Sequence, residues 1–245
     1  MESRTLILFA SEVMGVIAVM LLAGLSKSIR LRKPLGFKYP RREAVVSLTL
    51  FSLVLFAAIL FYKGVILPPQ TLYDIPYELW QQLVAALVAL AVILLALFIR
   101  KQPVRSAGWG KALLAPSARL GLALVFLTIF LRGAIFQLID GISRAEITSL
   151  IVWLIIALAE ETVFRGYLQL RVTSFFGEKY GWLVTALVFI IWQIPRLILH
   201  PETIWIRLAI VAIQAILLSW LMKRSGHVLG IALYRASSEW IWLLA

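Results

Sequence analysis

Long apolar segments recur along the chain and constrain its fold more than any other feature. Segments near the required length lie at residues 5–25, 44–67, 79–99, 120–139, 147–170, 181–199, 203–222 and 227–245. A helix needs about 20 residues to cross the roughly 30 Å hydrocarbon layer of a bilayer. Such a helix satisfies its own backbone hydrogen bonds, and the alternating pattern of a membrane barrel is absent. We therefore predict an all-α fold: a polytopic transmembrane helical bundle of about eight spans, in one membrane domain covering residues 1–245.

Composition supports a lipid environment, because 62% of the residues are hydrophobic, against about 45–50% in soluble domains. Basic residues gather in the loops on one side of the predicted bundle. These residues are Lys27, Arg30, Arg32, Lys33, Lys38, Arg41, Arg42, Arg100, Lys101, Arg105, Lys111, Arg119, Arg171, Lys179, Lys223 and Arg224, whereas the loops of the opposite side hold Arg4 and Arg144. Positively charged loops stay in the cytoplasm, so both termini are predicted to be extracytoplasmic. In a prokaryote the membrane would be the inner or plasma membrane.

The formal net charge of +12 is explained by this topology and by contact with membrane lipid. No nucleic-acid partner is therefore expected. Ionisable residues inside the spans are the more informative feature, because they are costly in lipid and normally face one another within the bundle.

The densest group of such residues lies in the segment 147–170. Glu161 and Arg165 are four residues apart, with the acid first, which favours an ion pair along one helix face. Glu160 points about 100° away from Glu161 and is left to face another helix. Two adjacent carboxylates in a low dielectric repel each other, and a carboxylate held in this way can activate water.

The pattern Glu160-Glu161-x-x-x-Arg165, extended through Phe164 to Leu168, resembles the first motif of the CAAX-protease and bacteriocin-processing family, also called CPBP or Abi. This resemblance implies an intramembrane endopeptidase with about eight helices, in which the first Glu is the water-activating base. It also implies two His residues on later spans that complete the site. The likeness covers about residues 147–242, while residues 1–140, with the first four spans, carry no motif.

The later motifs depart from the family pattern. Gln193 stands at the end of Phe189-x-x-x-Gln193, where the family has His. Arg235 stands at the second His position, in Arg235-x-x-x-Glu239, although a register from Tyr234 to Ser238 also remains open. Gln has no titratable proton and Arg cannot act as a base. No cofactor and no metal are therefore expected.

The remaining histidines, His200 and His227, are seven and eight residues away from the motif positions and are predicted to lie at the membrane surface. In their place, the Arg235 guanidinium is predicted to pair with Glu160 across two spans. Gln193 would donate a hydrogen bond to this network, and its outer members are predicted to be Glu239, Arg196 and Arg132.

Three functions follow from this pattern. The first is a member of the family whose active site is impaired or lost and which acts by binding another membrane protein or a membrane-embedded peptide. The second is an active intramembrane endopeptidase of the glutamic or metallo type, which uses Glu160 with Gln193 orienting the water. The third is a transporter, for which the sequence has buried charges but no inverted repeat.

Overall fold

The computed structural model describes residues 3–25, 36–66, 75–199 and 203–244, and within these ranges the regular elements are all helical. They are α1 (Ser3–Leu25), α2 (Pro40–Tyr62), α3 (Tyr77–Ile99), η1 (Val104–Ala107), η2 (Lys111–Leu113), α4 (Leu114–Leu131), α5 (Ala134–Asp140), α6 (Arg144–Glu161), η3 (Thr162–Gln169), α7 (Leu170–Leu197), α8 (Ile204–Ser225) and α9 (Val228–Leu244). The predicted all-α class is thus confirmed.

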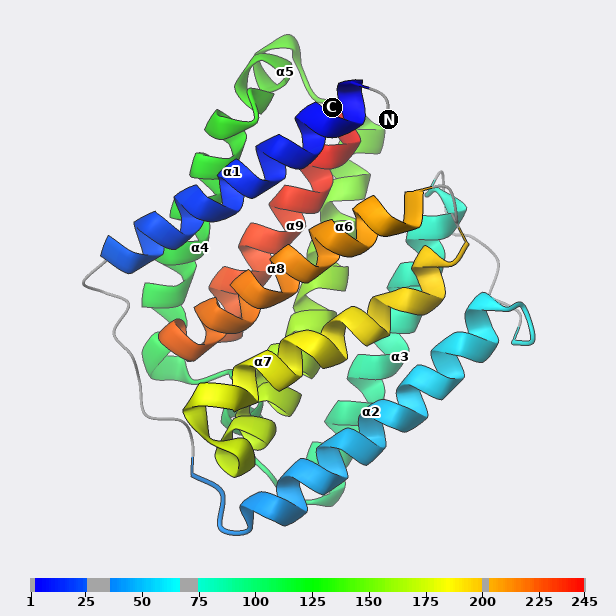
Figure 1. Ribbon diagram of the computed structural model, residues 1–245, viewed down its shortest axis with the longest axis vertical. Helices are drawn as coiled ribbons and strands as arrows, with labels where there is room; N and C mark the ends of the chain where they lie inside the picture. The colour runs from blue at the N-terminus through cyan, green and yellow to red at the C-terminus, as the bar shows by residue number, and fades with distance from the viewer. Residues whose placement is uncertain (1–2, 26–35, 67–74, 200–202, 245) are drawn as a thin grey trace.

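Helix α9 lies between α4 and α6 and contacts both along its length (Figure 1). Helix α7 packs against α8 on one side and against α2 on the other, while α3 packs against α6. The helices that follow one another from α6 to α9 therefore form the centre of the bundle, and α1, α2 and α3 cover it.

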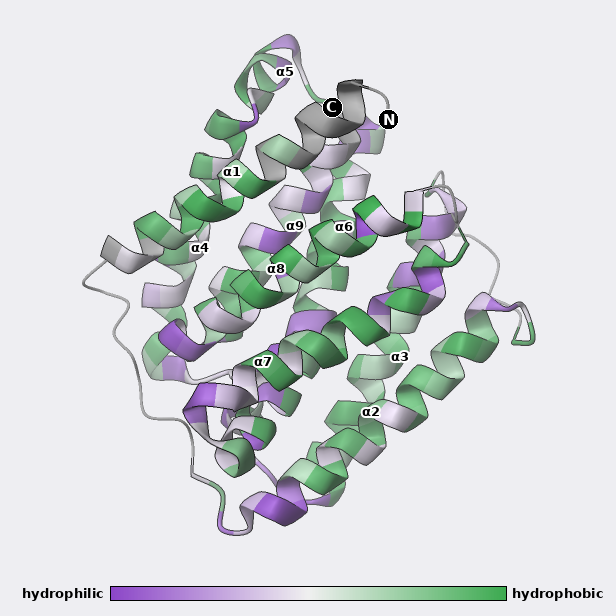
Figure 2. Ribbon diagram, in the orientation of Figure 1, coloured by the Kyte–Doolittle hydropathy of each residue, from purple (hydrophilic) through white to green (hydrophobic). Residues whose placement is uncertain are grey.

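The outer surface is apolar, as expected of a protein surrounded by lipid. Hydrophobic residues follow most of the length of α2, whereas hydrophilic residues gather where it begins (Figure 2). Several large hydrophobic side chains are almost fully exposed. In a soluble protein, a continuous apolar surface of this kind would promote association with other molecules. Examples are Phe98, Phe130, Phe136, Ile139 and Trp205.

Among the described residues, five helical stretches are long and apolar enough to cross a membrane. They are Pro40–Tyr62, Tyr77–Ile99, Lys111–Leu131, Arg144–Leu197 and Ile204–Ser225. The stretch Arg144–Leu197 reverses at Gly177, whose φ of 79° and ψ of 167° are not helical. The chain is therefore an integral membrane protein, but the predicted number of about eight spans is not confirmed. The first and last predicted spans correspond to α1 and to the 17-residue α9.

The predicted span 120–139 is wrong in its extent. Gly133, with a φ of 66°, separates α4 from the short helix α5. A left-handed backbone conformation is accessible to Gly at little cost and ends a helix. The apolar residues of α5 follow those of α4 in the sequence, so hydropathy alone joins the two helices into one segment.

Local signals fix the beginning of α6, which carries the two adjacent carboxylates. Ser143 Oγ accepts a hydrogen bond from the backbone N–H of Glu146, and the backbone N–H of Ser143 donates to Glu146 Oε2 at 2.6 Å. This reciprocal capping box satisfies two N–H groups that have no partner within the helix.

At its other end α6 continues into η3, which is a π-helical stretch. Insertions of this type recur at functional sites, because they turn the following side chains relative to the α-helix before them. Gly166 lies in this stretch, and a Cβ at this position would be only 2.1 Å from the backbone oxygen of Ala107 in η1. Only a glycine therefore allows η1 and η3 to approach so closely.

Candidate functional site

The two adjacent carboxylates of α6 are buried in the centre of the bundle. Glu160 and Glu161 are 1% and 0% exposed. Ionised groups at such a place need close partners of opposite charge, because the surrounding side chains and lipid cannot solvate them. The partners come from η3, from α7 and from α9.

Arg235 of α9 joins the two carboxylates. Its Nη1 donates to Glu161 Oε1 at 2.9 Å, and its Nη2 donates to Glu160 Oε2. The predicted ion pair between Arg235 and Glu160 is therefore present, and it extends to Glu161, which the sequence assigned to Arg165 alone. One planar guanidinium thus occupies the space between two carboxylates.

Arg165 provides the second positive charge of the cluster. Its Nη1 donates to Glu161 Oε1 at 3.3 Å, and its Nε lies 3.2 Å from Glu161 Oε2. The pair along the helix that the sequence predicted is thus formed, even though the helix is π-helical here. The Phe189 ring lies 3.9 Å from the Arg165 guanidinium carbon and 4.8 Å from that of Arg235, so it contributes a cation–π contact to both.

Glu160 accepts two further hydrogen bonds from α7. Trp192 Nε1 donates to its Oε1 at 3.0 Å, and Gln193 Nε2 donates to its Oε2 at 3.4 Å. The donation by Gln193 agrees with the sequence-based prediction. Together with Arg235, these groups surround the carboxylate with donors. A general base needs an oxygen within hydrogen-bond reach of the water that it activates, and here both oxygens already accept from side chains.

Trp192 is a site residue that sequence reasoning missed. It directly precedes Gln193, in a position that would equally suit a packing residue. The Phe164 ring lies 5.5 Å from the Trp192 ring and 5.2 Å from the Phe189 ring. Phe164 therefore supports both α7 aromatics beside the carboxylates. No local spacing distinguishes a tryptophan of this kind from one that faces lipid.

Of the outer members of the predicted network, two interact electrostatically with the cluster, Arg196 with Glu160 and Glu239 with Arg235. Arg196 donates to Gln82 Oε1 of α3. Arg132 donates to the backbone oxygen of Ser238 at 2.8 Å and to its Oγ at 3.1 Å. Glu239 is half-buried. The structure therefore brings Glu160, Glu161, Arg165, Gln193 and Arg235 together, with Arg132 and Arg196 at neighbouring helix contacts.

A second buried ionic cluster lies on the basic side of the bundle. Arg171 is 0% exposed, and its Nε donates to Glu43 Oε2 of α2 at 3.1 Å. Arg100, after α3, also donates to Glu43, and Gln102 donates to the same carboxylate at 3.1 Å. The prediction that Arg171 is a loop residue on the membrane surface is thus wrong, because Glu43 and the Tyr167 ring, 3.6 Å from its guanidinium carbon, enclose it.

His227, the histidine that the structure describes, does not join the carboxylates. His200 lies outside the described residues. His227 is buried rather than exposed at the surface, with its ring 5.6 Å from the Trp109 ring. Its Nδ1 accepts a hydrogen bond from the backbone N–H of Leu229 at 3.1 Å. His227 therefore caps the beginning of α9.

The residues of the carboxylate site do not fit the metal that the family resemblance implies. A divalent cation needs several anionic or neutral donors that converge on one point. Here the Arg235 guanidinium, a group without an acceptor, contacts both carboxylates. In the part of the chain that the structure describes, no three His, Cys, Asp or Glu side chains form a group that could hold a metal ion.

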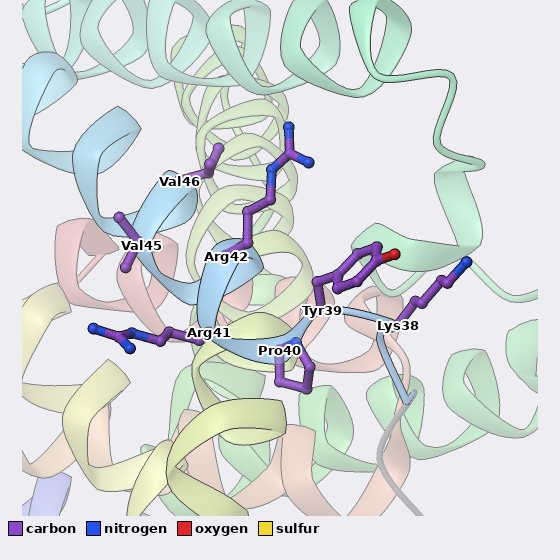
Figure 3. Close-up of a pocket in the computed structure, with 7 residues that line it drawn as sticks. All are labelled: Lys38, Tyr39, Pro40, Arg41, Arg42, Val45 and Val46. Atoms are coloured by element: carbon purple, nitrogen blue, oxygen red, sulfur yellow. The ribbon is translucent and has the colours of Figure 1, made fainter.

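An open hollow of about 540 Å³ lies at the beginning of α2, and its residues do not form a binding site for a ligand either. Its basic side chains Lys38, Arg41 and Arg42 point in different directions (Figure 3). A site for an anion would need them to converge.

Comparison with known proteins agrees with the motif. The model of the family described as type II CAAX prenyl endopeptidase Rce1-like matches residues 142–241. No curated protein and no solved structure gives a significant match to the chain. The matched residues include both carboxylates, Gln193 and Arg235. The resemblance drawn from the motifs is confirmed over this segment: residues 142–241 are similar to the Rce1-like CAAX prenyl endopeptidase family, within a chain whose apolar helices mark an integral membrane protein.

Proposed function

We propose that this protein is a catalytically silent member of its family, which acts by binding another membrane protein or a membrane-embedded peptide. The observation that carries the proposal is the position of Arg235. It stands where the family pattern has His, and its guanidinium contacts both Glu160 and Glu161.

The chemistry of these side chains supports the loss of hydrolysis. Arg cannot accept a proton, because its pKa exceeds about 12, and Gln193 has no proton to exchange. Arg235, Trp192 and Gln193 already take three of the about four acceptor positions of the buried Glu160 carboxylate, which leaves little room for a water molecule. Releasing Arg235 would leave charges unpaired in a buried site, which is costly. The cluster therefore suits a stable connection between α6, α7 and α9 better than a reaction cycle.

The competing function is an active endopeptidase that uses Glu160 as its base. The observation in its favour is the hydrogen bond of 3.4 Å from Gln193 Nε2 to Glu160 Oε2, the longest contact of this carboxylate. If a water molecule replaced this contact, Gln193 could orient it. Hydrolysis would then depend on Glu160 and on Gln193 together.

Comparison of the N-termini of membrane proteins in native cells distinguishes the two functions. Cells expressing the parent, Glu160→Gln, Gln193→Ala and the control Glu178→Gln are compared at equal protein abundance. Glu178 is an exposed carboxylate outside the cluster. We expect identical termini in all four, together with a stoichiometric membrane-protein partner of the parent. Termini present with the parent and Glu178→Gln, and lost with the two site variants, would establish the endopeptidase instead.

In the proposed topology the chain crosses the membrane about eight times. Helix α1 forms the first crossing and α9 forms the last, and both termini lie outside the cytoplasm. The uneven distribution of basic residues supports it. The chain has no Cys, so a single introduced cysteine reports on which side of the membrane its position lies. A membrane-impermeant thiol reagent should label Asp140→Cys in intact cells and should not label Lys111→Cys. The reverse pattern would invert the proposed orientation.

A further inference from the structure

An open apolar groove of about 490 Å³ runs between α3 and α6. Leu87 and Leu94 line it from α3, Ile155 and Leu158 from α6, and Trp109 closes one end. Leu87, Leu94 and Ile155 are 42%, 46% and 39% exposed. Helices of the bundle therefore leave a channel on the surface that faces lipid, instead of packing against each other there.

The dimensions of the groove match one leaflet of a bilayer. It follows α3 from Leu87 to Leu97, and at about 1.5 Å per residue this stretch is about 15 Å long. Half of the roughly 30 Å hydrocarbon thickness is the same length. A groove of this length that lies within one leaflet would place its end at Val104 and Trp109 near the level of the lipid headgroups.

Exposed positive charge lies at this end of the groove. Arg105 follows Val104 in η1, and Lys101 ends the turn after α3; both side chains are exposed. No hydrogen bond or ion pair joins either of these two side chains to another residue that the structure describes. The nearby carboxylate of Glu43 accepts from Arg100 and Arg171 and does not neutralise them. A positive surface therefore continues from the apolar groove.

We infer that this groove binds an acyl chain of an anionic phospholipid and that Arg105 and Lys101 hold its phosphate. An acyl chain suits the groove because it needs no hydrogen-bond partner, whereas an extended peptide would bring backbone N–H and C=O groups that an apolar wall cannot satisfy. The net negative charge of the headgroup suits the two basic side chains.

The position of Trp109 allows this binding to be observed directly. Its Nε1 donates to Thr162 Oγ1 at 3.1 Å, which holds the ring at the end of the groove. The full chain is reconstituted into vesicles of phosphatidylcholine that contain a small fraction of dibrominated lipid, because bromine quenches tryptophan fluorescence on contact. The difference between the parent and Trp109→Phe isolates the emission of Trp109 from that of the other tryptophans.

Brominated phosphatidylglycerol should quench Trp109 at concentrations roughly tenfold or more below those of brominated phosphatidylcholine with the same acyl chains, as two basic residues near a headgroup imply. Lys101→Gln with Arg105→Gln should abolish this preference. The matched control removes two exposed charges elsewhere, with Arg119→Gln and Lys179→Gln, and should retain it. Both double variants change exposed residues, and gel filtration verifies that they and Trp109→Phe fold.

Three outcomes would overturn the inference. Equal quenching of Trp109 by the two lipids shows that the groove has no preference for negative charge. Loss of the preference in both double variants shows a general attraction to the basic face. Displacement of the brominated lipid by water-soluble glycerol phosphate shows that the headgroup alone binds and that the groove adds nothing.

Discussion

Removal of the Arg235 guanidinium should destabilise the protein by roughly 4 kcal/mol at pH 7. In the parent, two carboxylates contact two guanidiniums, all at most 3% exposed. Arg235→Gln leaves this buried group with an excess negative charge. Breaking a buried ion pair from one side costs about 3–5 kcal/mol, whereas an average interhelical hydrogen bond in a membrane protein contributes about 0.6 kcal/mol. The cost of breaking a buried ion pair, and not that of losing one hydrogen bond, applies here because a charge remains without its partner.

The same variant should be destabilised much less at pH 5. An uncompensated carboxylate can be neutralised by a proton. For an ordinary Glu, the free energy of this protonation is about 3.7 kcal/mol at pH 7 and about 1 kcal/mol at pH 5. Proton uptake by the carboxylate therefore limits the loss of stability in Arg235→Gln to about these two values. The difference in free energy of unfolding between parent and variant should therefore shrink by about 2.7 kcal/mol as the pH falls from 7 to 5.

Equilibrium unfolding in mixed detergent micelles measures these differences, with tryptophan fluorescence as the signal. Arg119→Gln removes an exposed arginine and should change the free energy of unfolding by less than about 0.5 kcal/mol. Adding Glu160→Gln to Arg235→Gln removes the excess charge and should recover at least about 1 kcal/mol. A penalty below about 1 kcal/mol at pH 7, or an equal penalty at both pH values, would refute this electrostatic reasoning.

Three further predictions concern other positions and use the same unfolding measurement. Gly166→Ala should cost about 2–3 kcal/mol or more, because its Cβ would lie 2.1 Å from a backbone oxygen of η1, whereas Gly110→Ala meets nothing within 4 Å and should be tolerated. Glu43→Gln should destabilise the protein far more than Glu178→Gln, since it leaves two guanidiniums without their carboxylate; equal effects would contradict this. Burial lowers the pKa of His227, so the unfolded chain binds more protons and stability should decline as the pH falls below about 6.5. His227→Gln should remove that part of the slope, and an unchanged slope would exclude His227 as its cause.

The sequence was sufficient to predict the helical class and the approximate position of most spans. Hydropathy records how many consecutive residues lipid can solvate, which is a local property. It does not record where the backbone turns. The interruption at Gly133 and the reversal at Gly177 depend on left-handed φ values that neighbouring apolar residues conceal.

The carboxylate site was predictable in part, because buried charges must find partners. The pairs of Arg165 with Glu161 and of Arg235 with Glu160 follow from that requirement and from the helix spacing. The contact of Arg235 with both acids was not predictable, since it depends on how α9 packs against α6. The burial of Arg171 was missed for a related reason: its partner is 128 residues earlier in the chain, and charge counts treat any arginine next to a span as a loop residue.

That separation has a consequence for how the protein is assembled. The ribosome delivers α2 to the membrane long before α7 exists, so Glu43 must at first be hydrated at the bilayer surface. Arg100 can pair with Glu43 earlier, but the carboxylate is enclosed from both sides only after Arg171 has been synthesised and α7 has docked. Insertion of α2 and dehydration of its acidic end are therefore separate steps of biogenesis, and a nascent chain arrested before residue 170 should still expose this end of α2 to a water-soluble carboxylate reagent.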